Sequence, residues 1–191
     1  MDKQEIYRIL NEAYFSEECH EKDVLDHLPA LLGGVKVFVD VGASLGQYTF
    51  FANKHIQGGQ IFAIGADPVR FEELKENCRK WESESASNNK LTALHAAASD
   101  LDGKTMFFVT NSNVSGGLFK HNAAQAVDWH EIIESCYRLD TLFGDRGPDL
   151  VKIDVEGGEP RVLRGATAIL REGKAGFLIE THDWVDPEGQ V

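Results

Sequence analysis

The chain has 191 residues, of which 42% are hydrophobic and 26% are charged, and its formal net charge at neutral pH is −12. This length suits one domain with a substantial core. The acidic balance disfavours nucleic-acid binding, which depends on clustered Lys and Arg, and no apolar run approaches the roughly 20 residues of a membrane span. We therefore expect a small molecule as partner, with neither nucleic acid nor membrane.

The N-terminus and the cysteines indicate a cytoplasmic protein. Residues 1–5 are mixed in charge and lead into an amphipathic stretch instead of the apolar core of an export signal. Cys19, Cys78 and Cys136 are an odd number of cysteines with no C-x-x-C pair, which argues against a disulfide framework.

Helical spacing of apolar residues begins the chain, in residues 6–14 and again in residues 24–32, and Gly33-Gly34 follows. From residue 35 the pattern changes to buried strands alternating with helices. We therefore divide the chain into an N-terminal helical segment, residues 1–34, and one further domain, residues 35–191.

Five apolar runs in that domain are typical of strands buried on both faces. They are residues 35–41, 61–66, 91–98, 150–155 and 175–179, and the helix patterns between them are residues 46–55, 68–81 and 160–171. This alternation predicts an α/β fold, a doubly wound sheet with ligands at the carboxyl ends of its strands.

One region departs from the alternation. Residues 104–110 follow the turn Asp102-Gly103 and are predicted to form an extra strand beside that of residues 91–98. The polar residues 111–125 that come next are predicted to form a loop.

The turn after the first predicted strand, Gly42-Ala43-Ser44-Leu45-Gly46, fits two kinds of site. It matches the G-x-S-x-G nucleophile elbow of hydrolases, with a strand before it and a helix after it. It also fits a nucleotide-binding turn, in which Gly42 and Gly46 let the backbone bend beneath a ligand and Asp40 supplies an acceptor.

Topology favours the nucleotide interpretation. In the hydrolase fold several strands precede the serine, whereas here only residues 1–34 precede the strand, and their pattern is helical. Ser44 stands where a dinucleotide motif has the glycine that admits a pyrophosphate. S-adenosylmethionine carries no phosphate, and its ammonium and sulfonium suit an acidic site, so we expect this cofactor.

Six segments carry a family resemblance: VFVDVGASLGQYT, IFAIGADPVRFEELKENCRKW, LTALHAAASDLDGKTMFFV, RLDTLF, DLVKIDVEGGEPRVLRGA and FLIETH. In this order and spacing they resemble the FkbM family of S-adenosylmethionine-dependent methyltransferases, over about residues 35–182. The resemblance implies a class I methyltransferase, Rossmann-like fold with helices on both faces of a mostly parallel sheet. It also implies methyl transfer, usually to a hydroxyl oxygen of a small molecule or sugar.

The resemblance also implies site residues. Those that would hold the cofactor are Asp40, Gly42, Ala43, Ser44 and Gly46 at its methionine end, with Ser99 and Asp100 near the adenine.

Asp154 and Glu156 would face the transferring methyl. With Glu180 and His182 they are candidates for the base that takes the acceptor's proton. Asp154 and Glu156 could share a divalent ion, but residues two apart point the same way only while the strand lasts, so we expect no metal.

The resemblance is incomplete in two places. The family usually ends its second strand with an acid that holds the ribose hydroxyls, and Gly65 stands there in this chain. Asp67 could take that role, or it could cap the helix that begins at Pro68, or both. The chain also stops a few residues after His182, so we expect the C-terminal strands to be lacking and an open sheet edge, through which two copies could form a homodimer.

Three functions stay open. The favoured one is an O-methyltransferase, and the second is a degenerate, non-catalytic methyltransferase-like binding domain. The third comprises other nucleotide enzymes, such as NAD-dependent oxidoreductases, and the hydrolase.

Overall fold

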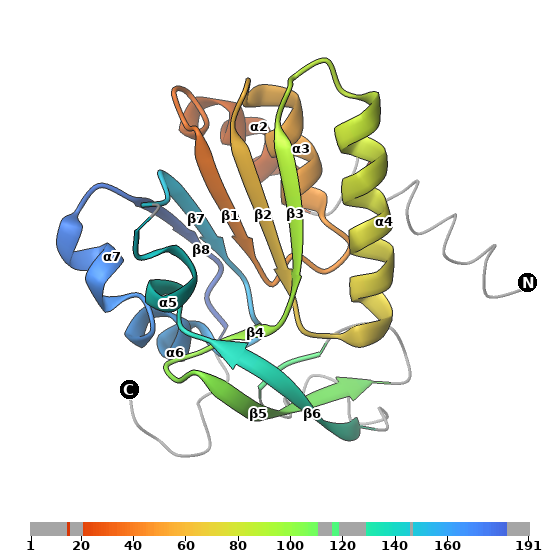
Figure 1. Ribbon diagram of the computed structural model, residues 1–191, viewed down its shortest axis with the longest axis vertical. Helices are drawn as coiled ribbons and strands as arrows, with labels where there is room; N and C mark the ends of the chain where they lie inside the picture. The colour runs from red at the N-terminus through yellow and green to blue at the C-terminus, as the bar shows by residue number, and fades with distance from the viewer. Residues whose placement is uncertain (1–14, 16–20, 111–115, 119–128, 146, 183–191) are drawn as a thin grey trace, which may run out of the picture.

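The structure, a computed structural model, describes residues 15, 21–110, 116–118, 129–145 and 147–182. The described chain contains a central five-stranded sheet with the order β3-β2-β1-β7-β8, in which each neighbouring pair is parallel (Figure 1). The strands are β1 (Val37–Val41), β2 (Gln60–Gly65), β3 (Lys90–His95), β7 (Leu150–Ile153) and β8 (Gly176–Ile179). The order reverses between β1 and β7, the kind of place where open α/β sheets bind ligands.

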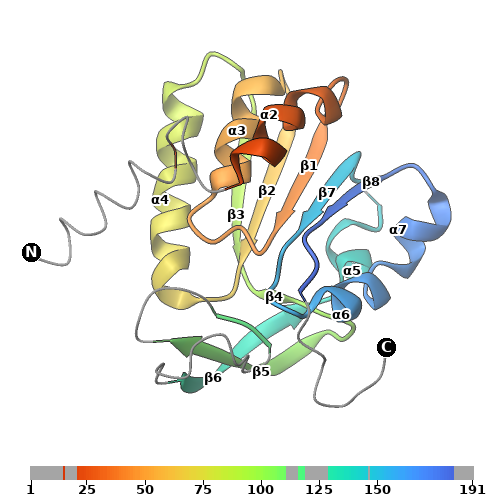
Figure 2. The same cartoon turned by 180° about the vertical axis from the view of Figure 1, so that it is seen from behind.

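Helices cover both faces of this sheet, as predicted (Figures 1 and 2). On one face lie α2 (Lys22–Leu31), α3 (Gln47–His55) and α4 (Pro68–Glu84), and on the other α5 (Leu139–Phe143), α6 (Glu159–Arg164) and α7 (Thr167–Glu172). Among the described residues, no helix combines the length and the apolar character needed to cross a bilayer.

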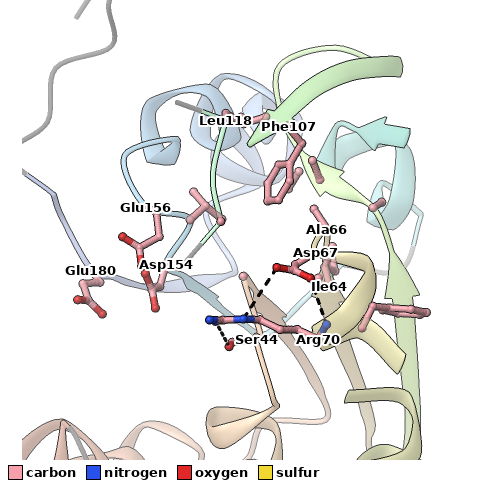
Figure 3. Close-up of a pocket in the computed structure, with 18 of the residues that line it drawn as sticks. Ser44, Ile64, Ala66, Asp67, Arg70, Phe107, Leu118, Asp154, Glu156 and Glu180 are labelled. Carbon is pink, nitrogen blue, oxygen red and sulfur yellow. Dashed lines mark hydrogen bonds and ion pairs between the residues drawn. The ribbon is translucent and has the colours of Figure 1, made fainter. Parts of the chain in front are cut away.

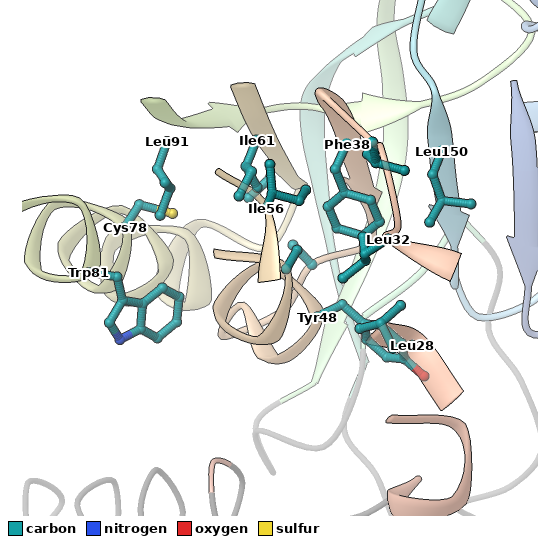
Figure 4. Close-up of a cluster of buried hydrophobic side chains, with 14 of the residues drawn as sticks. Leu28, Leu32, Phe38, Tyr48, Ile56, Ile61, Cys78, Trp81, Leu91 and Leu150 are labelled. Carbon is teal, nitrogen blue, oxygen red and sulfur yellow. The ribbon is translucent and has the colours of Figure 1, made fainter. Parts of the chain in front are cut away.

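The two cores follow from the alternation of side chains along each strand. Phe38 of β1 packs toward α2, α3 and α4, where it joins Leu28, Tyr48 and Trp81 in one buried cluster (Figure 4). Its neighbour Val39 points to the opposite face and belongs to the second cluster, with the helices α5 to α7.

A smaller sheet corrects the prediction for residues 91–110. Its order is β4-β6-β5, formed by β4 (Ala97–Ala98), β5 (Gly103–Thr110) and β6 (Trp129–Tyr137). The predicted strand 91–98 therefore ends at His95, and the chain crosses into the second sheet. β5 does not lie beside β3 as predicted, because it pairs antiparallel with β6, a strand that the sequence analysis did not predict.

The predicted helix 160–171 is also corrected, since it is broken into α6 and α7. The break follows Gly165, where an added Cβ would lie 2.0 Å from the carbonyl oxygen of Ser99. This close backbone contact requires glycine and turns the chain. The predicted helix of residues 6–14 lies outside the described residues, as does most of the predicted loop 111–125.

The packing of α2 on the sheet gives a first prediction. Leu28 is fully buried and Leu31 of the same helix is 48% exposed. We expect Leu28→Ala to lower the free energy of unfolding by about 2–5 kcal/mol, because it leaves a cavity in the core. The matched control Leu31→Ala should change it by less than about 0.5 kcal/mol. Urea denaturation measures both, and equal losses would contradict the packing of α2.

Candidate functional site

A cavity of about 350 Å³ lies between the carboxyl ends of β1, β2 and β7 and the strand β5 (Figure 3). It has an acidic end formed by Asp154, Glu156 and Glu180. On another side Arg70 extends toward Ser44, and Phe107 and Leu118 form an apolar wall.

The cavity brings together part of the predicted site. Gly42, Ser44, Asp67, Asp154 and Glu156 line it. The other predicted residues, which do not line it, are Asp40, Ala43, Gly46, Ser99, Asp100 and His182.

The glycine turn is pressed against the end of β7. Gly42 has a φ of +81°, and an added Cβ would lie 1.7 Å from the carbonyl oxygen of Asp154. Gly46 has a φ of +96°, and its Cβ would lie 2.9 Å from the Trp81 ring. Both positions therefore require glycine, and bare backbone faces the cavity at Gly42.

Ser44 has a positive φ of 51°, which a nucleophile elbow would also require. Its hydroxyl, however, accepts a hydrogen bond from Nη1 of Arg70 at 2.9 Å. A guanidinium cannot take a proton, so Arg70 cannot activate the serine. No histidine among the described residues bonds to Ser44, which further disfavours the hydrolase interpretation.

Asp67 caps helix α4, as one interpretation predicted. Its Oδ1 accepts hydrogen bonds from the backbone N–H groups of Val69 and Arg70, at 2.9 and 3.2 Å. Asp67 also lines the cavity, so a role in holding ribose stays a prediction. At Gly65 an added Cβ would meet only a side-chain carbon of Leu74, at 3.4 Å, and so the fold itself does not require glycine there.

Asp40 is buried beneath the turn and does not face the cavity. Its Oδ2 accepts hydrogen bonds from the backbone N–H and the hydroxyl of Thr49, at 3.0 and 2.7 Å. Burial raises the pKa of Asp40, although Lys152 and Thr49 oppose this. Its Oδ1 has no hydrogen-bond partner in the described part of the chain.

Lys152 is the cross-strand neighbour of Asp40, and it is only 4% exposed. Its Nζ lies 3.0 Å from Oδ2 of Asp154 and 4.4 Å above the ring centre of Tyr48. Burial alone would lower the pKa of Lys152, but the Asp40 and Asp154 carboxylates outweigh burial and raise it. The ammonium therefore stays charged.

The three predicted catalytic residues do come together. His182 lies with its Nε2 3.9 Å from Oδ1 of Asp154 and 3.6 Å from Oε2 of Glu156. Burial, and then the charge of Asp154, raise the pKa of Glu156. Glu21, which the sequence analysis missed, lines the same end, and burial together with Glu180 raises the pKa of its carboxyl to about 7.

Ser99 and Asp100 have structural contacts instead of a place in the cavity. The Ser99 backbone N–H donates to the carbonyl of Tyr137 at 3.0 Å, and Asp100 accepts from Nε of Arg164 at 2.9 Å. Burial would raise the pKa of Asp100, but the hydrogen bonds from Arg164, the backbone and Ser99 together outweigh burial and lower that pKa. The cavity wall near them is formed by residues 96–98.

The contact of Gly42 with β7 gives a second prediction. Gly58 also has a positive φ, +60°, but an added Cβ there would meet nothing within 4 Å. Gly58→Ala should lower the free energy of unfolding by about 1–2 kcal/mol, the cost of the left-handed backbone. Gly42→Ala should cost about 1–3 kcal/mol more, because it pushes the carbonyl of Asp154 away. Thermal or urea unfolding of both variants checks this, and equal losses would contradict the close contact.

The doubly wound sheet, with a glycine turn after its first strand and carboxylates after its fourth, defines a class I methyltransferase fold. The family model of the methyltransferase FkbM domain matches residues 40–190. The chain belongs to this family.

Solved structures agree on the fold. The crystal structure of methyltransferase FkbM from Methylobacillus flagellatus KT is similar, with a TM-score of 0.54 and 17% identity over 76% of this chain and 32% of that one. This chain thus spans 32% of the length of that structure. At such identity the likeness shows the fold alone.

Two further structures have lower TM-scores. Precorrin-6y C5,15-methyltransferase from Geobacter metallireducens GS-15 has a TM-score of 0.49 and 15% identity, over 88% of this chain and 68% of that one. A putative O-methyltransferase from Klebsiella pneumoniae has a TM-score of 0.48 and 13% identity, over 92% and 62%. No curated protein matches the sequence significantly.

Proposed function

We propose that the protein is an S-adenosylmethionine-dependent methyltransferase that transfers a methyl group to a hydroxyl oxygen of a small molecule or sugar. The observation that carries the proposal is the cavity at the point where the strand order reverses. It is lined on one side by the backbone of the glycine turn and at one end by carboxylates. Membership of the FkbM methyltransferase family supports methyl transfer as the reaction.

The residues present fit this cofactor. The cavity volume of about 350 Å³ lies within the range of small-molecule sites, about 300–1,000 Å³. Ile64, Ala66 and Ala97 also line the cavity and offer apolar surface that suits an adenosine. The ammonium and the sulfonium of the cofactor suit the carboxylates at the acidic end, because opposite charges attract strongly where water is partly excluded.

The chain's own residues would align the reactants and accept a proton. In the transfer, the acceptor oxygen forms a bond to the methyl carbon while the carbon–sulfur bond breaks, and sulfur keeps the electron pair of that bond. The hydroxyl proton passes to a base, for which Glu156 is suited because burial raises its pKa above that of an ordinary carboxylate. Nε2 of His182 lies 3.6 Å from Oε2 of Glu156.

A non-catalytic binding domain is the second candidate. It is favoured by one observation, that β2 ends in Gly65 and therefore offers no carboxylate to ribose at that position. A charged hydrogen bond is worth about 1.5–3 kcal/mol, so its loss weakens binding on the order of tenfold or more.

Partners and location belong to the same proposal. The acceptor is a small molecule, and β8, one of the two outer strands of the described central sheet, offers an edge for a homodimer. Cys78 and Cys136 are free and buried, which suits the reducing cytoplasm.

Calorimetric titration with S-adenosylhomocysteine, with NAD as the control ligand, tests the proposed function. We expect saturable binding of S-adenosylhomocysteine and none of NAD. Binding of NAD alone, or of neither ligand, would contradict the proposal.

Replacing Gly65 sharpens this test. We expect Gly65→Glu to raise the affinity for S-adenosylhomocysteine on the order of tenfold, because a carboxylate then reaches the ribose hydroxyls from a position with room for a side chain. The matched variant Gly65→Gln has nearly the same shape without the charge and should gain less. Equal affinities of wild type and both variants would show that the ribose does not lie at the end of β2.

A further inference from the structure

Three side chains at the ends of β7 and β8 converge at the acidic end of the cavity. Asp154, Glu180 and His182 each offer one ligand atom, and these atoms all lie within 4.8 Å of one another. The Nε2 of His182 is 3.9 Å from Oδ1 of Asp154 and 3.8 Å from Oε1 of Glu180. These separations are too long for hydrogen bonds, which measure about 2.7–3.2 Å. Two ligands that share one ion with bonds of about 2.0–2.2 Å lie about 3.3–3.6 Å apart in tetrahedral geometry, so side-chain shifts of a few tenths of an ångström would bring these atoms onto one ion.

The imidazole of His182 is oriented by a carboxylate outside this group of three. Its Nδ1 lies 3.1 Å from Oε1 of Glu159, which is buried and also accepts hydrogen bonds from the backbone N–H groups of Val155 and Gly157. When the ring proton is on Nδ1 and bonds to Glu159, Nε2 can offer its lone pair to a metal ion held by Asp154 and Glu180. Metal-bound histidines are held in this way by a carboxylate on their other nitrogen.

Asp154 divides its two oxygens between two partners. Oδ2 lies 3.0 Å from Nζ of Lys152, whereas Oδ1 is directed toward His182. The ammonium of Lys152 therefore compensates one side of this carboxylate only. Glu21, Glu156 and Glu180 line the same end of the cavity, so a cation there would relieve their mutual repulsion.

We propose that Asp154, Glu180 and His182 bind a divalent first-row transition-metal ion. One imidazole with carboxylates favours Mn²⁺, Fe²⁺ or Zn²⁺ over Ca²⁺, which prefers oxygen ligands alone. The expectation of no metal considered only Asp154 and Glu156, which follow one strand, whereas Glu180 and His182 come from the next strand of the sheet.

The ion would take part in the proposed methyl transfer, and this role rests on the proposed function. Coordinated at the acidic end, it would hold the oxygen of the acceptor's hydroxyl and promote loss of its proton. The proton would pass to Glu156 or to water, and the methyl group would then move from sulfur to that oxygen.

Titration of the protein with Mn²⁺ alone, after treatment with EDTA, tests the site by electron paramagnetic resonance. We expect one saturable site in the wild type, with a ¹⁴N coupling from the imidazole. Glu180→Gln and His182→Gln should weaken binding by a hundredfold or more, and His182→Gln should also abolish the ¹⁴N coupling. Glu159→Gln should weaken binding about 10–100-fold, because it frees the imidazole. Circular dichroism confirms that each variant is folded.

The control is Glu172→Gln, on the exposed surface of α7, which should leave Mn²⁺ binding unchanged. Absence of saturable binding, or equal binding in the wild type and in the folded Glu180→Gln and His182→Gln variants, would overturn the site. S-adenosylhomocysteine binding, measured without metal, separates the two proposals. If the protein binds S-adenosylhomocysteine but not Mn²⁺, only the proposed metal site is overturned. If it binds Mn²⁺ but not S-adenosylhomocysteine, only the proposed use of S-adenosylmethionine is overturned.

Discussion

The candidate site is built on β1 and β7, and it depends on one buried ammonium group, that of Lys152 on β7. Its strand neighbour is Asp40 on β1, its Nζ bonds to Asp154, and the ring of Tyr48 covers it. Removing one partner from a buried ion pair is strongly destabilising, because the other charge remains without compensation. The bond from Lys152 fixes Asp154 where it borders the cavity, and the ammonium also attracts the Asp40 carboxylate of the neighbouring strand.

The proposed preference of the site for a cation rests on this arrangement. Lys152 does not line the cavity, and its ammonium bonds to Asp154, so it compensates only part of the negative charge at the acidic end. Gly42 brings bare backbone against β7, which leaves room for a ligand between the turn and those carboxylates. This end of the cavity therefore suits two proposed ligands. One is a cofactor that carries an ammonium and a sulfonium, and the other is a divalent ion near Glu180.

The sequence predicted the central sheet well because its strands are short apolar runs buried on both faces, as residues 37–41 are. It did not predict β6, because Trp129–Tyr137 is largely exposed and pairs mainly with β5, so it carries no continuous apolar signal. The glycine turn and Asp154 were found from local motifs. Glu21 and Arg70 were missed, since only the folded chain brings them to the cavity and no local spacing marks them.

The electrostatic attraction between Lys152 and Asp40 is tested most directly by the free energy of unfolding in a double-mutant cycle of Lys152→Met and Asp40→Asn. Lys152→Met alone should cost about 3–5 kcal/mol, because it leaves buried carboxylates without a cation. Adding Asp40→Asn to that variant should cost little or restore stability, whereas Lys174→Met, at an exposed lysine, should be neutral. A small loss from Lys152→Met, or losses that simply add, would contradict the role of this ammonium.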